Sequence, residues 1–211
     1  MQHPVIVLGA GGHAKVLVDT LQRLSADIVA LVDVAHGGPH AVLGVPVVSG
    51  EETVLRYNPE EIRLVNGIGS VGSTRKRAGV FQRFHDQGYH FATVVHPAAV
   101  VAGEVTLAEG VQIMAGAVVQ PGCTIGADTI VNTGATIDHD CRIGAHVHIA
   151  PGATLSGGVV ADDGVHIGAG ATVIQGVRLG ADSIVGAGAA VLKDVAVAAT
   201  VVGVPAKEAH S

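Results

Sequence analysis

A period of six residues governs the second half of the chain and constrains its fold more than any other feature. From Val95 to Val191, every sixth position carries a branched aliphatic residue, with Ala161 as the exception. The residue four positions later is always small, and the residue three positions later is mostly Gly or Asp. We interpret each aliphatic as a core residue and each Gly or Asp as a turn residue that tolerates a positive φ angle.

Three such hexads make one triangular coil of a parallel β-helix, a known product of hexapeptide repeats. The seventeen hexads give nearly six coils, so residues 95–211 are predicted to form an all-β, parallel β-helix domain. Residues 18 positions apart should then stack on the same face. The rule for parallel crossovers would by itself make this coil right-handed.

Residues 1–94 follow a different pattern, in which short apolar runs alternate with segments of helical period. This alternation predicts a small, Rossmann-like α/β domain with a parallel sheet. The expected strands are residues 4–8, 28–32 and 62–65, the expected helices are 13–25 and 73–87, and residues 91–94 should be extended.

Composition narrows the class of protein. The net charge is −6 and no basic cluster occurs, which argues against nucleic-acid binding. Two Cys residues do not make a disulfide framework. We see neither a signal peptide nor an apolar run long enough to span a membrane, so a soluble, cytoplasmic protein is expected.

His139 breaks the repeat at the outward corner position, two residues after the core aliphatic, where Gly, Ala and Pro prevail. An imidazole beside the carboxylate of Asp140 on a rigid corner can act as a general base. The alternative is an ordinary exposed His beside a turn residue. Asp128, Asp182 and Asp194 occupy the same turn position as Asp140 and need no further role.

Two further pairs of residues are 18 positions apart and should stack. His148 and His166 form either an outward polar face, a ligand groove or a metal site. Cys123 and Cys141 occupy the small inward position, where buried packing is a better interpretation than nucleophilic chemistry.

In the first half, the glycine-rich turn of residues 9–12 joins a strand to a helix, whose first N–H groups would attract a phosphate. The full G-x-G-x-x-G spacing is missing, because Ala14, followed by Lys15, stands where the third Gly would fall. Asp33 ends the next strand, where it would either contact a ribose or base, or be an ordinary strand-end acid.

Three segments together resemble a known family. Residues 5–16, 132–141 and 203–207 are similar to the opening, the catalytic segment and the ending of hexapeptide-repeat sugar acyltransferases. That family includes sialic acid O-acetyltransferases and N-acetyltransferases of UDP-linked 4-amino sugars and of GDP-perosamine. The resemblance covers the whole chain. It implies a left-handed β-helix, a homotrimer with active sites between neighbouring β-helices, acetyl-CoA as co-substrate and no metal.

The resemblance also implies roles for particular residues. His139 would be the catalytic base and Asp140 would raise its basicity. Contacts to acetyl-CoA would come from His148, Ala169 and Ala187. The nucleotide of the substrate would be held by Gly12, His13, Ala14, Asp33, Val34 and Gly69. The family often has Asn after that last Gly, whereas this chain has Ser70, so the base and the sugar stay open.

The reaction that the resemblance implies is direct acetyl transfer to the amino group of a nucleotide-linked 4-amino-4,6-dideoxy sugar. His148 or a backbone N–H would stabilise the oxyanion. Three alternatives are O-acetylation of sialic acid, a non-catalytic sugar-nucleotide sensor, and a metalloenzyme similar to γ-class carbonic anhydrases. The last would use ligands from among His139, His146, His148 and His166, but carbonic anhydrases lack the N-terminal α/β domain.

Overall fold

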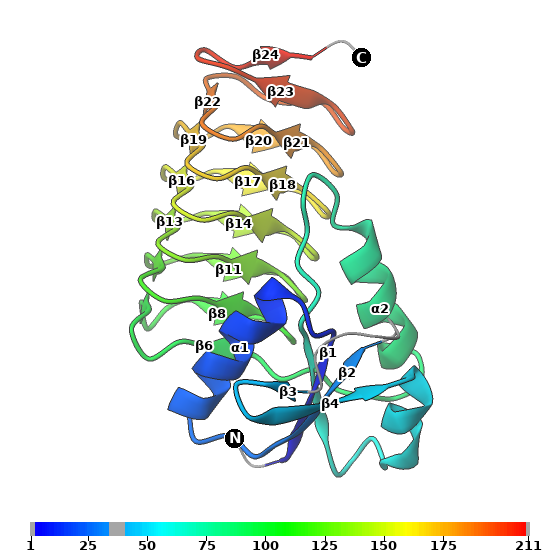
Figure 1. The fold of residues 1–211 in the computed structure, drawn as a ribbon. Helices are drawn as coiled ribbons and strands as arrows, with labels where there is room; N and C mark the ends of the chain where they lie inside the picture. Colours follow the sequence, from blue (N-terminus) through cyan, green and yellow to red (C-terminus); the bar gives the residue numbers. More distant parts are fainter. Residues whose placement is uncertain (1–2, 34–40, 210–211) are drawn as a thin grey trace.

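A computed structural model of the chain describes residues 3–33 and 41–209. The first part is a five-stranded sheet of order β3-β4-β2-β1-β5, parallel except for the pairing of β3 with β4 (Figure 1). Its elements are β1 (Val5–Leu8), α1 (Gly12–Arg23), β2 (Ile28–Asp33), β3 (Ala41–Val42), β4 (Val45–Ser49), the 3-10 helix η1 (Glu51–Arg56), β5 (Arg63–Asn66) and α2 (Arg75–His85).

The two helices cover opposite faces of this sheet, because alternate residues of β1 point to opposite sides. Val5 and Val7 pack with Leu17 of α1, whereas Ile6 and Leu8 pack with Phe81 of α2. The predicted strands and helices of this half are confirmed to within two residues at each end. The elements β3, β4 and η1 were not expected.

The second part is a parallel β-helix in which every hexad contributes one short strand. The strands are β6 (Val94–Val95), β7 (Val100–Val101), β8 (Thr106–Leu107), β9 (Gln112–Ile113), β10 (Val118–Val119), β11 (Thr124–Ile125), β12 (Ile130–Val131), β13 (Thr136–Ile137), β14 (Arg142–Ile143), β15 (His148–Ile149), β16 (Thr154–Leu155), β17 (Val160–Ala161), β18 (His166–Ile167), β19 (Thr172–Val173), β20 (Arg178–Leu179), β21 (Ile184–Val185), β22 (Ala190–Val191), β23 (Thr200–Val202) and β24 (Lys207–Glu208). β6 spans the predicted boundary between residues 1–94 and 95–211.

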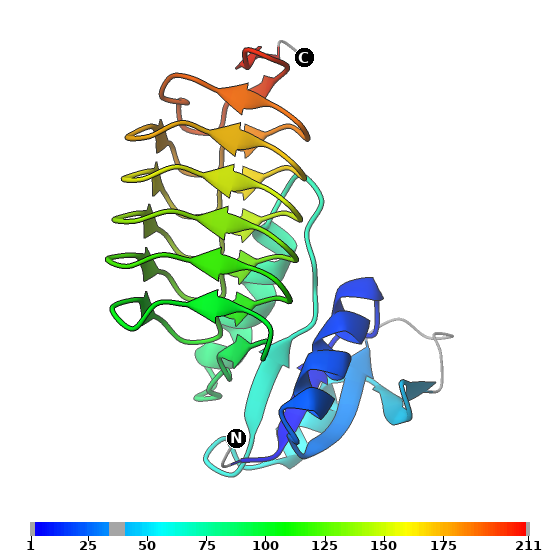
Figure 2. The same cartoon turned by 90° about the vertical axis from the view of Figure 1, so that its left-hand side faces the viewer.

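Strands one coil apart pair in parallel, so that residues 18 positions apart lie side by side, as Ile130 and His148 do. Three sheets result, and we name each by a member strand: the β15 sheet, the β13 sheet and the β14 sheet. The β13 sheet faces the viewer in Figure 2, where its strands run to the left while the chain climbs from green to red. The coil is therefore left-handed, as the resemblance implied, and its interior is filled by the predicted aliphatic residues.

The turns follow the prediction with one correction. Ten Gly residues of the repeat, together with Asp128, Asp140 and Asp182, have positive φ angles. Asp194 does not, although it occupies the same position in its hexad. Its carboxylate instead accepts a hydrogen bond from the backbone N–H of Arg178 at 2.8 Å.

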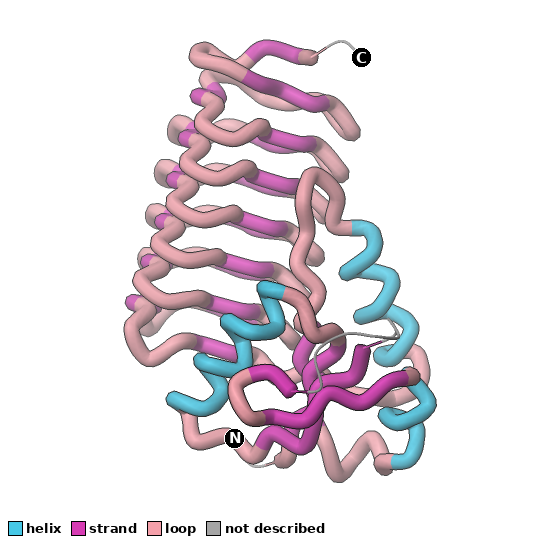
Figure 3. Tube along the Cα trace, viewed as in Figure 1, coloured by secondary structure: helices cyan, strands magenta, loops and turns pink. Residues whose placement is uncertain are grey.

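The segment between β5 and α2 climbs along one corner of the β-helix (Figures 1 and 3). Thr74 donates a hydrogen bond to the carbonyl of Gly164 at 3.1 Å, and Arg75 pairs with Asp182 at 3.2 Å. The α/β part thereby covers the β15 sheet. In the described ranges 3–33 and 41–209, no helix is long and apolar enough to cross a membrane.

Candidate active site

A cleft of about 1500 Å³ lies between the α/β part and the β15 sheet. Its walls come from the turns after β1, β2 and β5, from the start of α2, and from the β-helix. Its polar and glycine lining residues include Gly11, Gly12, His13, Asp33, Gly69, Ser70, Asn132 and His148. The cleft therefore joins the predicted nucleotide-binding turn to one predicted acetyl-CoA contact.

The N-terminus of α1 lies at this cleft, where the turn after β1 packs closely against the loop after β5. Gly9 has a φ of +97°, which favours glycine, and turns the chain from β1 into α1. A Cβ at Gly67 would lie 2.8 Å from the carbonyl oxygen of Leu8, and a Cβ at Gly69 would lie 3.2 Å from Cβ of His13. Gly11, Gly12 and His13 at the start of α1 line the cleft, and the N–H groups of a helix N-terminus favour an anion such as a phosphate.

His13 is held by a chain of hydrogen bonds. Gln112 donates from Nε2 to the carbonyl of Asn66 at 2.8 Å, so its Oε1 accepts from His13 Nε2 at 2.7 Å. Burial, and then the charge of Arg77, lower the pKa of His13 to about 4, against the opposing effect of the Gln112 hydrogen bond. The ring is therefore neutral at pH 7, with its proton on Nε2.

His148 is buried, and both of its ring nitrogens have partners. Nδ1 lies 2.6 Å from Oγ of Ser70, and Nε2 lies 3.1 Å from Nδ2 of Asn132. Burial lowers the pKa of His148 to about 3, aided by His166, His13 and Arg77 and opposed by a hydrogen bond with the backbone of Ser70. With both nitrogens occupied, His148 has no N–H left for an oxyanion, so a backbone N–H suits that role better.

His148 and His166 lie side by side on one face as predicted, with ring centroids 5.2 Å apart in an edge-to-face arrangement. The interpretation as a solvent-exposed polar face is wrong, because His148 and His166 are buried, with 5% and 8% of each residue exposed. Of the interpretations offered, a ligand groove fits His148, which lines the cleft.

Arg77 connects the loop after β5 to the β-helix and is fully buried. Its guanidinium pairs with Asp128 at 2.7 Å and donates to the carbonyls of Asn66 and Ile68 at 2.9 and 2.8 Å. His146 contacts the other carboxylate oxygen of Asp128 at 3.1 Å. Asp128 is thus more than a turn residue, since it fixes the loop that carries Gly69.

His139 and Asp140 form the predicted pair on a different corner of the β-helix. Nδ1 of His139 lies 2.8 Å from Oδ2 of Asp140, and the imidazole is 63% exposed. The hydrogen bond to Asp140, followed by the charge of Asp138, raises the pKa of His139. Because the carboxylate accepts the Nδ1 proton, the neutral ring presents the lone pair of Nε2 to solvent.

Neither His139 nor Asp140 lines the cleft of the same chain. Ala169 and Ala187 are exposed on the corner that follows the β15 sheet, outside the cleft. Ala14 is completely buried, so its side chain is hidden from a ligand. Val34 lies outside the described residues, whereas Gly12, His13, Asp33 and Gly69 all line the cleft.

The two cysteines are buried thiols that donate hydrogen bonds. Cys123 Sγ donates to the carbonyl of Asp138 at 3.0 Å, and Cys141 Sγ donates to that of Ser156 at 3.3 Å. Burial raises the pKa of Cys123 and raises that of Cys141 to about 12. Both therefore remain protonated at pH 7 and are poor nucleophiles. Within the described residues, no group of three or more His, Cys, Asp or Glu could hold a metal ion.

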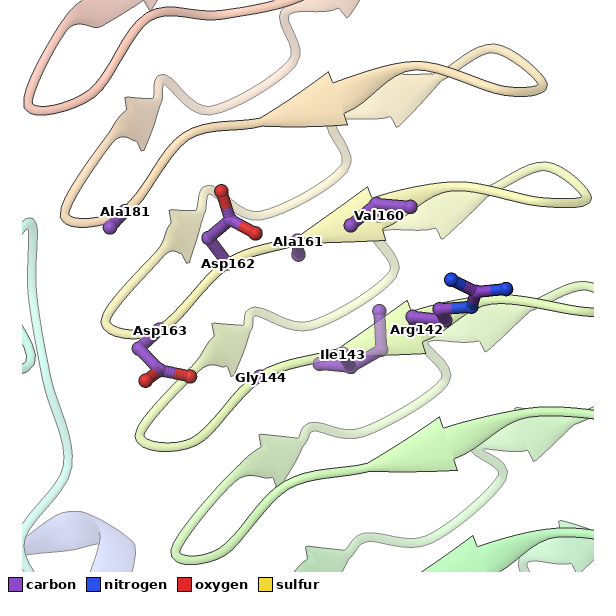
Figure 4. A pocket seen from close by; sticks show the side chains of 8 residues that line it. All are labelled: Arg142, Ile143, Gly144, Val160, Ala161, Asp162, Asp163 and Ala181. Carbon is purple, nitrogen blue, oxygen red and sulfur yellow. The ribbon is translucent and has the colours of Figure 1, made fainter.

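A second pocket, of about 370 Å³, lies on the outer face of the β14 sheet (Figure 4). Arg142, Asp162 and Asp163 are its charged lining residues, and Arg178 pairs with Asp162 at its edge at 2.8 Å. None of the predicted site residues lies there. We place the site in the larger cleft, because the helix N-terminus and the buried polar groups converge on it.

Sequence reasoning missed Ser70 as a contact, Gln112, Asn132 and the Arg77–Asp128 pair. One signal was available: Gln112 lies 36 residues before His148 and therefore on the same face of the coil. The partners of Arg77 had no such signal, because α2 and the β-helix meet only in the folded chain.

Comparisons with known proteins agree with this architecture. A family model described as "PglD N-terminal domain" matches residues 4–84, and one described as "Bacterial transferase hexapeptide (six repeats)" matches residues 104–139 and 122–157. A comparison with curated protein sequences found no match.

Three solved structures are similar over nearly the full length. The acetyltransferase domain of PglB from Neisseria gonorrhoeae FA1090, also solved in complex with acetyl coenzyme A, is 33% identical with a TM-score of 0.90, covering 99% of this chain and 100% of that chain. PerB from Caulobacter crescentus, in complex with CoA and GDP-perosamine, is 39% identical with a TM-score of 0.87, covering 100% and 99%. WeeI from Acinetobacter baumannii AYE is 26% identical with a TM-score of 0.88, covering 99% and 100%.

Proposed function

We propose, from the premise that this chain belongs to the family of hexapeptide-repeat sugar acyltransferases, that it acetylates the amino group of a nucleotide-linked 4-amino-4,6-dideoxy sugar. Acetyl-CoA is the donor, and the cytoplasm is the proposed location. The observation that carries the proposal is the cleft, which brings the N-terminus of α1 and Asp33 opposite His148 of the β-helix. A diphosphate fits the helix N-terminus and a ribose or base fits the strand end, which leaves the sugar beside the β-helix.

The chemistry of the proposal rests on His139. Nε2 removes a proton from the substrate amine as its nitrogen forms a bond to the thioester carbonyl carbon. The carbon–sulfur bond then breaks, and His139 returns the proton to the leaving thiolate. Because the amine attacks the thioester directly, no acyl-enzyme forms. Asp140 holds the Nδ1 proton of His139 and favours the cationic ring. General base catalysis contributes about 10²- to 10⁴-fold, and positioning of the two substrates supplies the remainder.

The proposed assembly is the homotrimer that the family resemblance implies, in which neighbouring chains together complete the site. His139 and Asp140 lie on a corner of the β-helix outside the cleft of their own chain. In the proposal, this corner of one chain faces the cleft of its neighbour and there meets the sugar amine.

The first experiment is a thiol-release assay with acetyl-CoA and a panel of UDP- and GDP-linked 4-amino-4,6-dideoxy sugars and sialic acid. We expect thiol release together with an amino sugar that is heavier by one acetyl group. Release with sialic acid alone would replace the proposal by O-acetylation. Binding of the nucleotide sugars without thiol release would favour a sugar-nucleotide sensor.

A complementation experiment tests the shared site. One variant, His139→Ala, lacks the base, and a second, Gly12→Glu, places a negative charge at the phosphate end of the cleft. Each should be inactive alone. Mixed trimers, made by co-expression with two different tags, should regain part of the activity, because some sites then combine an intact base with an intact cleft. Mixed trimers as inactive as the parents would contradict a site between subunits.

A further inference from the structure

A hydrogen-bonded relay of three side chains, Asn132, His148 and Ser70, connects the β-helix to the α/β part at the wall of the cleft. It begins at Asn132, whose orientation is fixed by its own turn. The backbone N–H of Thr133 donates to Oδ1 of Asn132 at 2.8 Å. The amide nitrogen of Asn132 must therefore be the atom that faces Nε2 of His148, at 3.1 Å.

This orientation decides the tautomer of His148. An amide nitrogen only donates, so Nε2 of His148 must accept and carries no proton. The ring is buried and neutral, which places its single proton on Nδ1. Nδ1 then donates to Oγ of Ser70 across 2.6 Å.

The hydroxyl group of Ser70 is left with a proton to give. A serine hydroxyl has one donor and two acceptor sites, and the ring of His148 uses one acceptor site. No second partner of Ser70 Oγ occurs in residues 3–33 and 41–209. Ser70 is partly exposed and lines the cleft.

We propose that Ser70 is a sugar-binding residue, whose hydroxyl donates a hydrogen bond to an oxygen atom of the sugar, and that Asn132 and His148 are positioning residues that fix the direction of this donor. The inference rests on the proposed function and deepens it. Successive hydrogen bonds polarise one another, so the relay also strengthens the final donor.

The position of Ser70 in the cleft favours the sugar over the diphosphate. The phosphate end is at the start of α1, where Gly11 and Gly12 offer backbone N–H groups. Ser70 contacts the β-helix instead, and the sugar must reach the β-helix for acetyl transfer. Ser70 stands where the resemblance leads us to expect Asn, so this donor would contribute to the choice of sugar.

Binding measurements on the full-length protein without acetyl-CoA test the contact. We expect Ser70→Ala to weaken binding of the preferred UDP- or GDP-linked 4-amino sugar by about 3- to 10-fold, the effect of one hydrogen bond. Its affinity for UDP or GDP alone should be unchanged. Ser70→Thr keeps the hydroxyl and should retain most of the affinity. Ser73→Ala, on the same loop but outside the cleft, is the matched control.

Steady-state kinetics add a second readout: Ser70→Ala should raise KM for the sugar nucleotide more than KM for acetyl-CoA. An equal loss of affinity for the nucleoside diphosphate would assign Ser70 to the phosphates and overturn the proposal. Unchanged sugar-nucleotide binding in Ser70→Ala would also overturn it, while thiol release by the same variant would leave the proposed function standing.

The tautomer can be tested without any substrate. Nitrogen-15 NMR of the wild-type imidazoles should show His148 neutral, with the proton on Nδ1, at pH 6 to 8. Asn132→Ala removes the donor to Nε2 and should shift His148 toward the other tautomer. A wild-type His148 with its proton on Nε2 would overturn the relay, whatever the protein acetylates.

Discussion

The imidazole of His139 lies directly over Gly157 of the next coil. A Cβ at position 157 would come within 2.6 Å of both Cε1 and Nε2 of the ring. Only a residue without a side chain leaves the proposed general base in this place, because coils stack at the fixed spacing of paired strands.

We therefore expect Gly157→Ala to displace the ring and lower kcat by about 10- to 100-fold, as small misplacements of catalytic groups do. Gly103 occupies the same corner three coils earlier, and a Cβ there meets nothing within 4 Å. Gly103→Ala is thus the matched control and should keep wild-type turnover. Equal activities of the two variants, measured by thiol release, would contradict the placement of His139.

The pH dependence of kcat/KM should report the raised pKa of His139. The base works only when unprotonated, so activity should fall as the pH drops through a value above 6.5. Asp140→Asn removes the charge and should move this limb to lower pH. The equivalent change Asp182→Asn, at another turn with positive φ, should leave the limb in place. A limb unaffected by Asp140→Asn would exclude Asp140 as the cause.

Stability should also depend on pH through His13, whose pKa is lowered to about 4 by burial. Between pH 6.5 and 4 the unfolded chain binds a proton at this residue and the folded chain does not. The free energy of unfolding should therefore decrease as the pH falls through this window, by about 1.4 kcal/mol per pH unit at full effect. Denaturant titrations of His13→Gln should show a shallower decrease; identical slopes would mean that His13 titrates normally in the folded protein.

Two arginines of the same helix should differ sharply in their contribution to stability. Arg77 and its partner Asp128 are fully buried, whereas Arg75 and Asp182 are exposed. Arg77→Met leaves a buried carboxylate without its cation and should cost about 3–5 kcal/mol. Arg75→Met should cost about 0–1 kcal/mol. Urea unfolding measures both, and Arg77→Met with Asp128→Asn should recover part of the loss.

The two cysteines should react only slowly with thiol reagents in the folded protein. Cys123 and Cys141 are buried thiols with raised pKa values, so an aromatic disulfide reagent at pH 8 should react slowly with them. After addition of denaturant, two cysteine thiols per chain should react rapidly with the reagent. Cys141→Ala should retain acetyl transfer, and its loss in a folded variant would point to a covalent route through this residue.

The β-helix could be predicted almost completely, because each hexad repeats the same local requirement for a core aliphatic such as Ile137 and a turn residue such as Gly134. The exception at Asp194 arises where the last hexad leaves the regular coil. The α/β part was predicted less fully. The strand at Val45–Ser49 contains Pro46 and lies at the edge region of the sheet, so its pattern is weak.

The residues of the candidate site could be predicted only where they break the repeat or belong to a recognisable local motif. His139 stands out because every neighbouring corner is small, and Gly12 belongs to a recognisable turn. Ser70 and Asn132 have no such mark. Their meeting through His148 depends on how the loop after β5 lies against the β-helix, which is a long-range contact that no local pattern encodes.

The segment from Thr74 to Arg77 touches Asp128, Gly164 and Asp182, three residues of one corner separated by 36 and 18 positions. These contacts span a fixed number of coils. The α/β part can therefore make all of them only if the number of coils between Asp128 and Asp182 stays the same. A repeat protein can ordinarily gain or lose a whole coil at little cost. Here the removal of a coil between Asp128 and Asp182 would break some of these contacts. A coil added after Asp182 would leave the contacts and the cleft intact. Insertions and deletions of whole coils in homologous proteins should therefore occur mainly at the C-terminal end of the β-helix.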